Sequence, residues 1–235
     1  MNLRNENKSK LVKKVFNQVY DKYDLMNDIM SLGSHRIWKK NLVSWVNPQK
    51  NNKILDVASG TGDIARLCSD SSDNLCEIKC VEPNEKMLLK GKKKLNKLKN
   101  LEWIQASAEN LPFKSDYFDY YIISFGIRNV SNLNKSLDEA FRVLKNGGRF
   151  FCLEFSKVEN EFLRKIYMNY SRILPSIGKF VVGDYMPYEY LVQSIEQFYC
   201  QKDFSEKLEL TGFTKVKYRN LTNGIAAIHT GWKIE

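Results

Sequence analysis

The segment that begins at Lys53 most constrains the fold, because a short apolar strand there leads directly into a glycine-rich turn and a helix. Residues 53–58 are the predicted strand, Gly60 and Gly62 form the turn, and the helix begins near Asp63. Glycines at such a place let the backbone turn sharply and let a ligand come close to a helix N-terminus. The segment therefore predicts an α/β fold with a nucleotide-type ligand at this turn.

Strands and helices continue to alternate after the turn. Further strands are predicted at residues 77–82, 101–105, 120–125 and 148–155, with helices at 86–99 and 133–144. Such alternation is typical of a doubly wound parallel sheet. Two last strands, at 216–221 and 225–230, are joined by Thr222-Asn223-Gly224, and Asn-Gly is a strong hairpin signal. We expect seven strands, mostly parallel, with a C-terminal antiparallel hairpin.

The chain is predicted to be a single domain, since no linker, repeat or low-complexity tract divides residues 1–235. Apolar residues recur every four positions near the N-terminus, which predicts helices there. After Phe155 the alternation stops, and helices are predicted at 161–174 and 190–198. The expected parts are N-terminal helices (1–50), a cofactor-binding core (51–155), inserted substrate-cover helices (156–204) and a closing helix with the hairpin (205–235).

Two carboxylates in the core indicate which cofactor binds. Glu82 ends the second strand, twenty residues past Gly62, where a carboxylate accepts both hydroxyls of a ribose. This feature suits NAD and S-adenosylmethionine equally. Asp56 lies inside the first strand, where it suits the ammonium of an amino-acid-bearing cofactor and has no pyrophosphate to repel; the alternative is that it caps the glycine loop. Together with the hairpin, Asp56 favours S-adenosylmethionine and a Rossmann-like class I methyltransferase fold.

Three more residues follow strands of this core. Ser107 and Ala108 come after the third strand, where a polar side chain and a backbone N–H usually hold the adenine of such a cofactor. Ser124 ends the fourth strand. An ordinary loop hydroxyl and a strand-end cap are the alternatives for the two serines. We expect these residues, with the glycine turn, Asp56 and Glu82, to form one cofactor site.

The charge of the chain first points to nucleic acid, because 37 Lys and Arg stand against 27 Asp and Glu, a net charge of +10. Seven lysines and no acidic residue lie between Lys86 and Lys99, and without them the net charge falls to +3. These lysines coat the solvated face of one predicted helix. The N-P-P-Y and D-P-P-Y motifs of base-methylating enzymes are absent after the fourth strand. We therefore expect no nucleic-acid partner.

Cysteine usage and hydropathy set further bounds. Five cysteines without a C-x-x-C pair, beside two histidines, form no metal-ligand pattern, so no metal site is expected. No apolar run approaches the ~20 residues of a membrane span, and the N-terminus lacks the apolar core of a signal peptide. We expect a cytoplasmic protein with reduced thiols.

Longer motifs give the chain a family resemblance over nearly its full length. It resembles the ubiquinone/menaquinone biosynthesis C-methyltransferase family in several strings of residues. They are K-Y-D-L-M-N-D from Lys22, G-S-H-R-I-W-K from Gly33, A-S-G-T-G-D from Ala58, S-F-G-I-R-N-V from Ser124 and L-E-F-S-K from Leu153. The S-F-G-I-R-N and L-E-F-S-K strings are far more specific than the glycine turn.

The resemblance implies an activity and a cofactor site. The activity is S-adenosylmethionine-dependent C-methylation of a polyprenylated quinol, either 2-methoxy-6-polyprenyl-1,4-benzoquinol, demethylmenaquinol or both. The implied cofactor contacts are Thr61, Glu82, Ser107 with Ala108, and Ser124. Ser59, Glu82 and Ser107 depart from the family's usual Gly, Asp, and Asn or Asp, yet each keeps the size or hydrogen-bonding chemistry of the residue it replaces.

Arg128 and Asn129 are the predicted catalytic residues, because they follow the fourth strand at the edge where ligands bind in open α/β sheets. Asn129 is expected to fix a ring oxygen. Arg128 stays protonated and so is no base; it stabilises a phenolate or positions a water that takes the proton. The alternative is that Arg128 only forms a salt bridge that holds the loop. The general base is not identified by the sequence.

Substrate chemistry suggests further partners. Apolar residues between Ile166 and Val182 are expected to line a groove for the isoprenoid tail, or to close the core. A lipid-tailed substrate implies peripheral contact with the inner face of the membrane. A homodimer and contacts with other quinone-biosynthesis enzymes are also compatible with the family. Two alternatives stay open: a methyltransferase for another small molecule or RNA, and a non-catalytic subunit of a quinone-synthesis complex.

Overall fold

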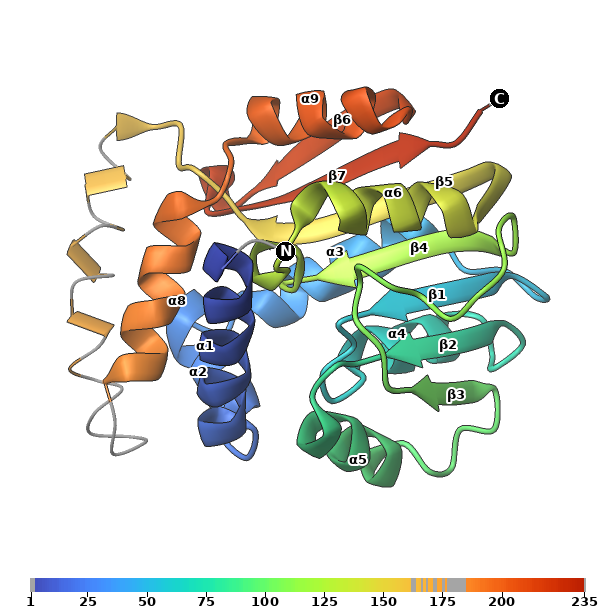
Figure 1. Cartoon of the computed structure of the whole chain (residues 1–235), viewed down its shortest axis with the longest axis horizontal. Coiled ribbons are helices and arrows are strands. Elements are labelled where there is room, and N and C mark those ends of the chain that lie inside the picture. Colours follow the sequence, from blue (N-terminus) through green and yellow to red (C-terminus); the bar gives the residue numbers. More distant parts are fainter. Residues whose placement is uncertain are drawn as a thin grey trace.

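The computed structural model in Figure 1 places a central sheet between layers of helices, with a helical group beyond one end of the strands. It describes residues 3–161 and 185–234, together with residues 164, 165, 167, 169, 170, 173, 174 and 176. The seven-stranded sheet has the order β3-β2-β1-β4-β5-β7-β6. Its strands are β1 (Lys53–Val57), β2 (Glu77–Val81), β3 (Leu101–Ile104), β4 (Phe118–Ser124), β5 (Leu144–Phe155), β6 (Thr214–Leu221) and β7 (Ala226–Trp232).

Helices connect these strands and precede the first one. The α-helices labelled in Figure 1 are α1 (Leu3–Val19), α2 (Tyr23–Ser31), α3 (His35–Val46), α4 (Asp63–Ser71), α5 (Glu85–Lys94), α6 (Leu133–Val143), α8 (Met186–Gln197) and α9 (Gln201–Thr211). Short 3-10 turns follow β4 and β6, at η1 (Ile127–Asn129) and η2 (Thr222–Gly224).

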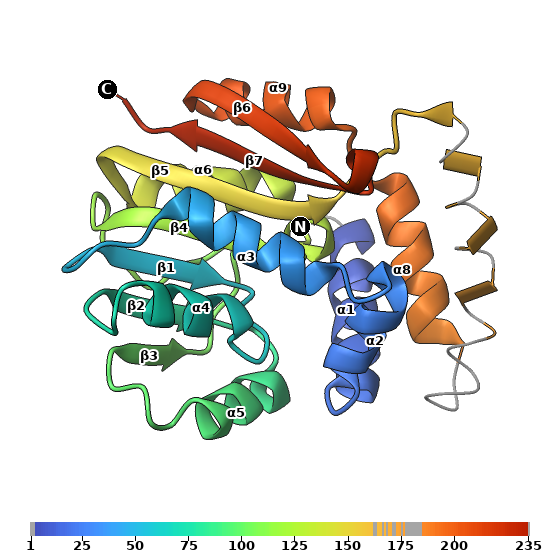
Figure 2. The ribbon, with the colours of Figure 1, turned by 180° about the vertical axis from the view of Figure 1, so that it is seen from behind.

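Two apolar cores cover the two faces of the sheet. α3 and α4 lie on one face, where Leu42 of α3 packs in the same cluster as Ile122 of β4 (Figure 2). α6 and α9 lie on the other, where Leu137 and Phe204 share a cluster with Tyr121 (Figure 1). Tyr121 and Ile122 are chain neighbours, and the alternation of side chains along a strand sends them to opposite faces.

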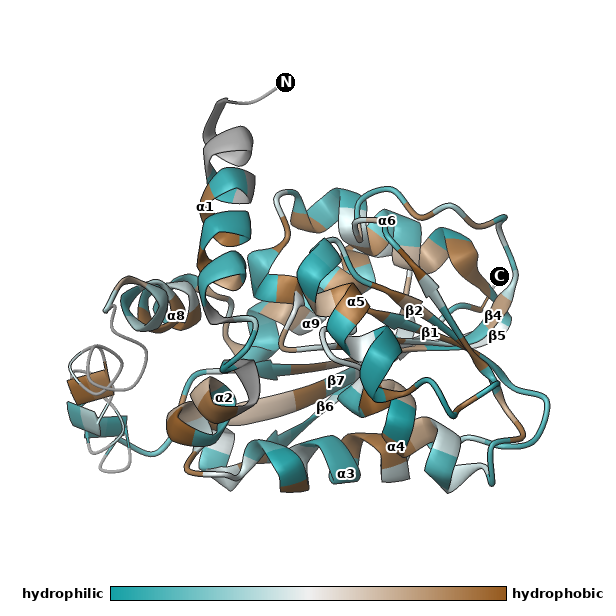
Figure 3. Ribbon diagram, turned by 90° about the horizontal axis from the view of Figure 1, so that it is seen from below, coloured by the Kyte–Doolittle hydropathy of each residue, from teal (hydrophilic) through white to brown (hydrophobic). Residues whose placement is uncertain are grey.

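α1, α2 and α8 stand beyond the carboxyl ends of the parallel strands (Figures 1 and 2). α1 contacts α2 and α8. Lys8 of α1 also reaches the loop after β4, since its Nζ donates to the carbonyl oxygens of Arg128 and Val130 at 3.0 and 2.8 Å. Figure 3 shows bands of apolar and hydrophilic residues along α1, as expected of a helix with one packed side. The helical group therefore closes over the edge where ligands bind in open α/β sheets.

The predicted sheet and hairpin are confirmed. β1, β2, β3, β4 and β5 pair in parallel, and β7 lies antiparallel between β5 and β6. The predicted helix at 86–99 is wrong at its end, because α5 stops at Lys94 and a turn follows in which the Leu98 N–H donates to the Leu95 carbonyl at 3.0 Å. Leu88, Gly91, Leu95 and Leu98 are the apolar residues expected on its inward face; the first three are buried, whereas Leu98 follows the helix and is half-buried.

The segment after β5 is described only in part. The predicted helix at 161–174 is described only in part, and its described residues are helical, while most of the residues expected to line an isoprenoid groove lie outside the described residues. Of those described, Leu174 is fully buried, Ile173 is 56% exposed, and the Tyr170 hydroxyl donates to the Ile29 carbonyl of α2. No helix in the described part of the chain is long and apolar enough to cross a membrane. All five cysteines are free thiols, and four of them are buried.

Candidate active site

The site begins where β1 and β4 end side by side. Ala58 and Phe125 directly follow these strands, and both adopt the left-handed backbone conformation, with φ of 53° and 55°. Gly126 packs against Ala58 so closely that a Cβ on Gly126 would lie 2.6 Å from the Ala58 Cβ. Two neighbouring strands that both bend away at their carboxyl ends leave an opening between the loops that follow, the place where open α/β sheets bind ligands.

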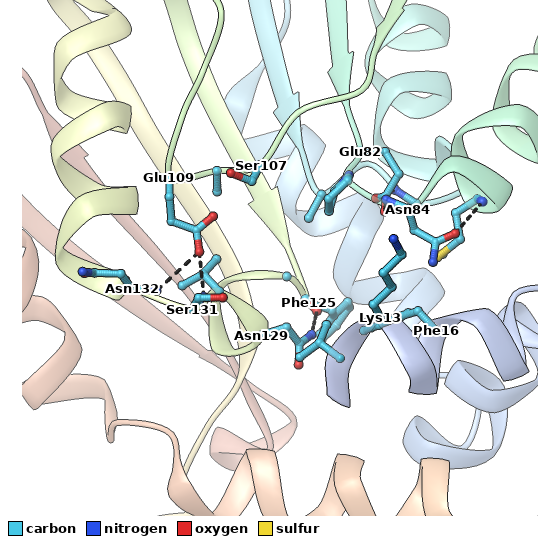
Figure 4. Close-up of a pocket in the computed structure, with 18 of the residues that line it drawn as sticks. Lys13, Phe16, Glu82, Asn84, Ser107, Glu109, Phe125, Asn129, Ser131 and Asn132 are labelled. Atoms are coloured by element: carbon cyan, nitrogen blue, oxygen red, sulfur yellow. Dashed lines mark hydrogen bonds between the residues drawn. The ribbon is translucent and has the colours of Figure 1, made fainter. Parts of the chain in front are cut away.

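A cleft of about 710 Å³ occupies this opening (Figure 4). It brings together five of the predicted site residues: Gly60, Glu82, Ser107, Ala108 and Asn129. In Figure 4, Glu82 and Ser107 lie toward the sheet, while Asn129 and Phe125 lie nearer the helical group. Val12, Lys13 and Phe16 of α1 line the same cleft, and sequence reasoning did not assign them to it. The volume fits a drug-sized ligand with room for a second ring.

Glu82 is the anchor of this cleft on the sheet side. Its Oε2 accepts a hydrogen bond from the Gly60 N–H at 2.9 Å, and its Oε1 accepts one from the Asn84 N–H at 2.9 Å. The residue is only 5% exposed, and burial raises the pKa of its carboxyl group to about 7. Two hydroxyl donors, as a ribose supplies, would favour the ionised form. This geometry fits the role predicted for Glu82.

A small recess of about 20 Å³ adjoins the cleft and shares Ala58, Gly60 and Phe125 with it. The recess is lined by three more predicted residues, Asp56, Thr61 and Ser124. Asp56 is 1% exposed, and burial raises the pKa of its carboxyl group to about 7. Neither the Asp56 Oδ2 nor the Ser124 Oγ has a hydrogen-bond partner among the described residues. These buried polar atoms fit a ligand that carries its own ammonium and carboxylate, as the amino-acid end of S-adenosylmethionine does.

Gly62 lines neither the cleft nor the recess, although it was predicted to bind cofactor. It precedes α4 with a φ of 84°, and a Cβ there would lie 2.6 Å from Leu95 Cδ1 and 2.9 Å from Trp103 Cη2. Glycine is therefore needed at this position because the left-handed backbone before α4 packs directly against the side chains of Leu95 and Trp103. The turn's contact with the cleft comes from Gly60.

Arg128 also lies apart from the main cleft. Its Nη1 donates to the Glu154 Oε1 of β5 at 2.6 Å and to the Phe125 carbonyl at 2.8 Å, and its Nε lies 3.4 Å from the Ser194 Oγ. The side chains of Arg128 and Glu154 are 4% and 2% exposed. Arg128 lines a separate cleft of about 470 Å³ between α1 and α8. The geometry matches the alternative in which Arg128 holds the loop by a salt bridge.

Asn129 is held in one orientation by a residue that sequence reasoning missed. The Tyr190 hydroxyl of α8 donates to the Asn129 Oδ1 at 2.9 Å, and the Asn129 Nδ2 lies 3.4 Å from the Phe125 carbonyl. Because Oδ1 accepts from Tyr190 and one Nδ2 hydrogen is directed to the Phe125 carbonyl, the side chain has its other N–H donor left for the cleft. An acceptor such as a ring oxygen is therefore the group that Asn129 suits best.

Lys39 and Asp63 are further residues of the recess that sequence reasoning missed. A signal was present, because His35, Leu42, Val43 and Val46 are buried on α3 and Lys39 falls on the same helical face. A lysine among apolar neighbours at that spacing indicates a buried charge with a partner. A separate question is whether the site could hold a metal ion, and no group of three His, Cys, Asp or Glu side chains in the described ranges is placed to do so.

Comparisons with known proteins agree with this geometry. Residues 2–233 match the ubiE/COQ5 methyltransferase family. The ubiquinone/menaquinone biosynthesis C-methyltransferase of Brucella abortus (strain S19) is 48% identical over 233 residues, which cover 97% of this chain and 87% of that protein.

Two solved structures share the fold at low identity. A SAM-dependent methyltransferase of Thermotoga maritima, described as a possible histamine N-methyltransferase, aligns with a TM-score of 0.68 and 17% identity, covering 94% of this chain and 99% of that one. The Haemonchus contortus phosphoethanolamine N-methyltransferase 2 bound to S-adenosyl-L-methionine aligns with a TM-score of 0.62 and 14% identity, covering 84% and 52%. The chain therefore belongs to the ubiE/COQ5 methyltransferase family and is a SAM-dependent C-methyltransferase.

Proposed function

We propose that this protein transfers a methyl group from S-adenosylmethionine to a ring carbon of a polyprenylated quinol. The substrate is 2-methoxy-6-polyprenyl-1,4-benzoquinol, demethylmenaquinol or both, as the family and the names of its relatives suggest. When bound, S-adenosylmethionine supplies a methyl group on a positively charged sulfur, an electrophile for an electron-rich ring. The ring carbon of the quinol forms the new C–C bond while the S–CH3 bond breaks and leaves S-adenosylhomocysteine, and the attacked ring carbon then loses its proton to water.

One observation carries the proposal: residues suited to both reactants line the same cleft. Glu82 and Ser107 on the sheet side have the chemistry of nucleoside contacts, and Asn129 near the helical group offers an N–H donor. Both reactants are thereby held in one space of about 710 Å³, so their reaction becomes effectively intramolecular. α1 closes the cleft with Val12 and Phe16, which helps to exclude water.

In this proposal Asn129 contacts a ring oxygen of the quinol. As a hydroxyl of the ring loses its proton, its oxygen gains negative charge and the hydrogen bond from the Asn129 Nδ2 strengthens. That interaction favours the electron-rich form that forms the new bond. The Tyr190 hydroxyl contributes by keeping the Oδ1 of Asn129 away from the same oxygen.

Arg128 acts in this proposal through the loop that carries Asn129. Its guanidinium joins the Phe125 carbonyl to the Glu154 carboxylate and so fixes η1 on the end of β5. The isoprenoid tail gives the enzyme reason to meet the membrane surface from the cytoplasmic side, without a spanning segment.

A labelled-methyl assay tests the proposal. Purified protein, methyl-labelled S-adenosylmethionine and a short-tailed quinol of each class are incubated side by side, and label in the quinol is measured. We expect turnover with at least one class, lost in Asn129→Leu while S-adenosylhomocysteine binding changes less than about threefold. Asn132→Ser is the matched control, because Asn132 lines the same cleft and serine keeps its N-cap of α6. Absence of label in both quinols would overturn the proposal.

A further inference from the structure

The recess beside the glycine turn holds charges of both signs, and one of them comes from outside the methyltransferase core. Lys39 lies on α3, within the N-terminal helices, and is only 7% exposed. Its Nζ donates to the Asp63 Oδ2 at 2.8 Å, at the first residue of α4. Figure 2 shows α3 and α4 on the same face of the sheet, and the two helices are in contact. A lysine is rarely buried to this extent unless it is paired.

Asp63 has a second cation, so Lys39 is not required to neutralise it. The Lys94 Nζ of α5 donates to the Asp63 Oδ1 at 2.9 Å, and Lys94 is more exposed than Lys39. The three charges leave a net positive charge beside the recess. An ammonium group has three donors. Only one of those on Lys39 is used by a hydrogen bond within the described part of the chain.

The recess also contains a carboxyl group and a hydroxyl group without partners. Asp56 presents the unpartnered Oδ2 and Ser124 the unpartnered Oγ, both buried, and both residues line the recess together with Lys39. The recess itself has room for about one water, at about 20 Å³, but it shares Ala58, Gly60 and Phe125 with the large cleft. A carboxylate with a free acceptor and an ammonium with free donors at this junction complement the zwitterionic end of a ligand bound in the cleft. α-Amino acids carry this pair of charges on adjacent groups.

We infer that Lys39 binds the carboxylate of the methionyl end of the methyl donor, while Asp56 faces its ammonium. The inference rests on the proposed function and adds a specificity-determining residue to it. A residue of the N-terminal helices thereby takes part in cofactor recognition. The recess, with Lys39 and Asp56 together, then distinguishes S-adenosylmethionine and S-adenosylhomocysteine from adenosine derivatives that lack the amino-acid end.

Truncated ligands separate this role from a purely structural one. S-adenosylhomocysteine carries both charges, decarboxylated S-adenosylmethionine keeps the ammonium and lacks the carboxylate, and 5′-methylthioadenosine lacks both. Dissociation constants for the three are measured by calorimetry on the wild type, Lys39→Met and Lys94→Met. Lys94→Met is the matched control, because it removes the other cation of Asp63 outside the recess.

Lys39→Met should weaken S-adenosylhomocysteine about 10- to 100-fold, the range of a charged hydrogen bond lost on one side. It should change the dissociation constants of the other two ligands less than about threefold. Lys94→Met should change the dissociation constant of each of the three ligands less than about threefold. Lys39→Arg should keep S-adenosylhomocysteine within about tenfold of the wild type, and it serves as the test variant if Lys39→Met does not fold.

Two results would overturn the inference: equal weakening of all three ligands by Lys39→Met, which marks a role in folding alone, or unchanged S-adenosylhomocysteine affinity. If Lys39→Met does not fold, the wild type and Lys39→Arg decide: equal affinity for S-adenosylhomocysteine and decarboxylated S-adenosylmethionine in both proteins would overturn the inference, because the carboxylate would then contribute nothing to binding. These readouts need no quinol. Failure of the quinol assay with the expected binding pattern would therefore reject the proposed function and keep Lys39 as a cofactor residue.

Discussion

Cofactor binding should weaken steeply as pH falls below about 7, because the two buried carboxyl groups of the site must ionise to bind it. The pKa values of Asp56 and Glu82 are both raised to about 7 in the ligand-free protein. Burial is the main cause in each case. An ammonium beside Asp56 and two ribose hydroxyls beside Glu82 both favour the charged carboxylate.

The size of the effect follows from these pKa values. A group with a pKa of about 7 is ionised in roughly ten molecules out of eleven at pH 8 and in roughly one out of eleven at pH 6. Each carboxyl therefore weakens binding about tenfold over that interval, and the two together about 100-fold. We expect the dissociation constant of S-adenosylhomocysteine, measured by calorimetry, to rise by about this factor from pH 8 to pH 6.

A variant and a truncated ligand assign the two tenfold changes in dissociation constant to Glu82 and Asp56. Glu82→Gln should bind S-adenosylhomocysteine more weakly at pH 8, and its dissociation constant should rise only about tenfold from pH 8 to pH 6. The dissociation constant of 5′-methylthioadenosine, which has no ammonium for Asp56, should also rise only about tenfold with the wild type. A dissociation constant that changes less than threefold from pH 8 to pH 6 would refute the reasoning. It would mean that the carboxyls are already ionised or do not touch the cofactor.

The raised pKa of Glu82 also has a consequence for stability that runs in the opposite direction. The folded protein keeps a proton on Glu82 that the unfolded chain loses above its ordinary pKa of 4.5, so ionisation of Glu82 lowers stability as pH rises from 4.5 to about 7. The loss is on the order of 3 kcal/mol and is absent from Glu82→Gln. Burial lowers the pKa of His35 and His229, so these two groups make the folded protein more stable as pH rises and oppose the effect of Glu82. The quantity to compare is therefore the difference in the free energy of unfolding in urea between Glu82→Gln and the wild type at each pH.

Three further predictions concern the framework of the site. Arg128→Met should lower the free energy of unfolding in urea by about 3–5 kcal/mol, since it leaves Glu154 buried and unpaired, and a double replacement by apolar residues should recover much of it; a loss under 1 kcal/mol would contradict a structural ion pair. Tyr190→Phe should lower kcat on the quinol about fivefold, the value of one hydrogen bond to Asn129, with KM for S-adenosylmethionine unchanged; a change in that KM alone would count against it. Gly62→Ala should lower the free energy of unfolding by about 1–3 kcal/mol, because its Cβ meets Leu95 at 2.6 Å in a left-handed backbone, and an unchanged melting temperature would contradict this.

The fold could be predicted because its signals are local. The strand, turn and helix from Lys53 to Asp63 lie within a dozen residues, and the Thr222-Asn223-Gly224 turn fixes the hairpin between β6 and β7. The ends of helices have weaker signals in the sequence than the helices themselves. α5 ends at Lys94 although lysines and leucines continue to Lys99, because composition alone does not mark where a helix gives way to a turn.

The site could be predicted only where its residues follow a strand end. Glu82, Ser107 and Asn129 come after β2, β3 and β4, so topology alone brings them to one cleft. Partners distant in the chain gave no comparable signal. Tyr190 is 61 residues from Asn129 and Glu154 is 26 from Arg128, and neither pairing leaves a periodicity in the sequence.

The buried charges of the site divide into two kinds. Arg128 and Glu154 satisfy each other at 2.6 Å, so their pairing is complete without a ligand and belongs to the framework. Asp56 is buried with an oxygen that has no partner among the described residues, a state that costs folding free energy in the ligand-free protein. In the proposal above, the amino-acid end of the methyl donor supplies the opposite charges for Asp56 and Lys39, which both line the recess. Binding of the cofactor should therefore raise the free energy of unfolding with the logarithm of cofactor concentration, by about 1.4 kcal/mol for each tenfold increase above the dissociation constant.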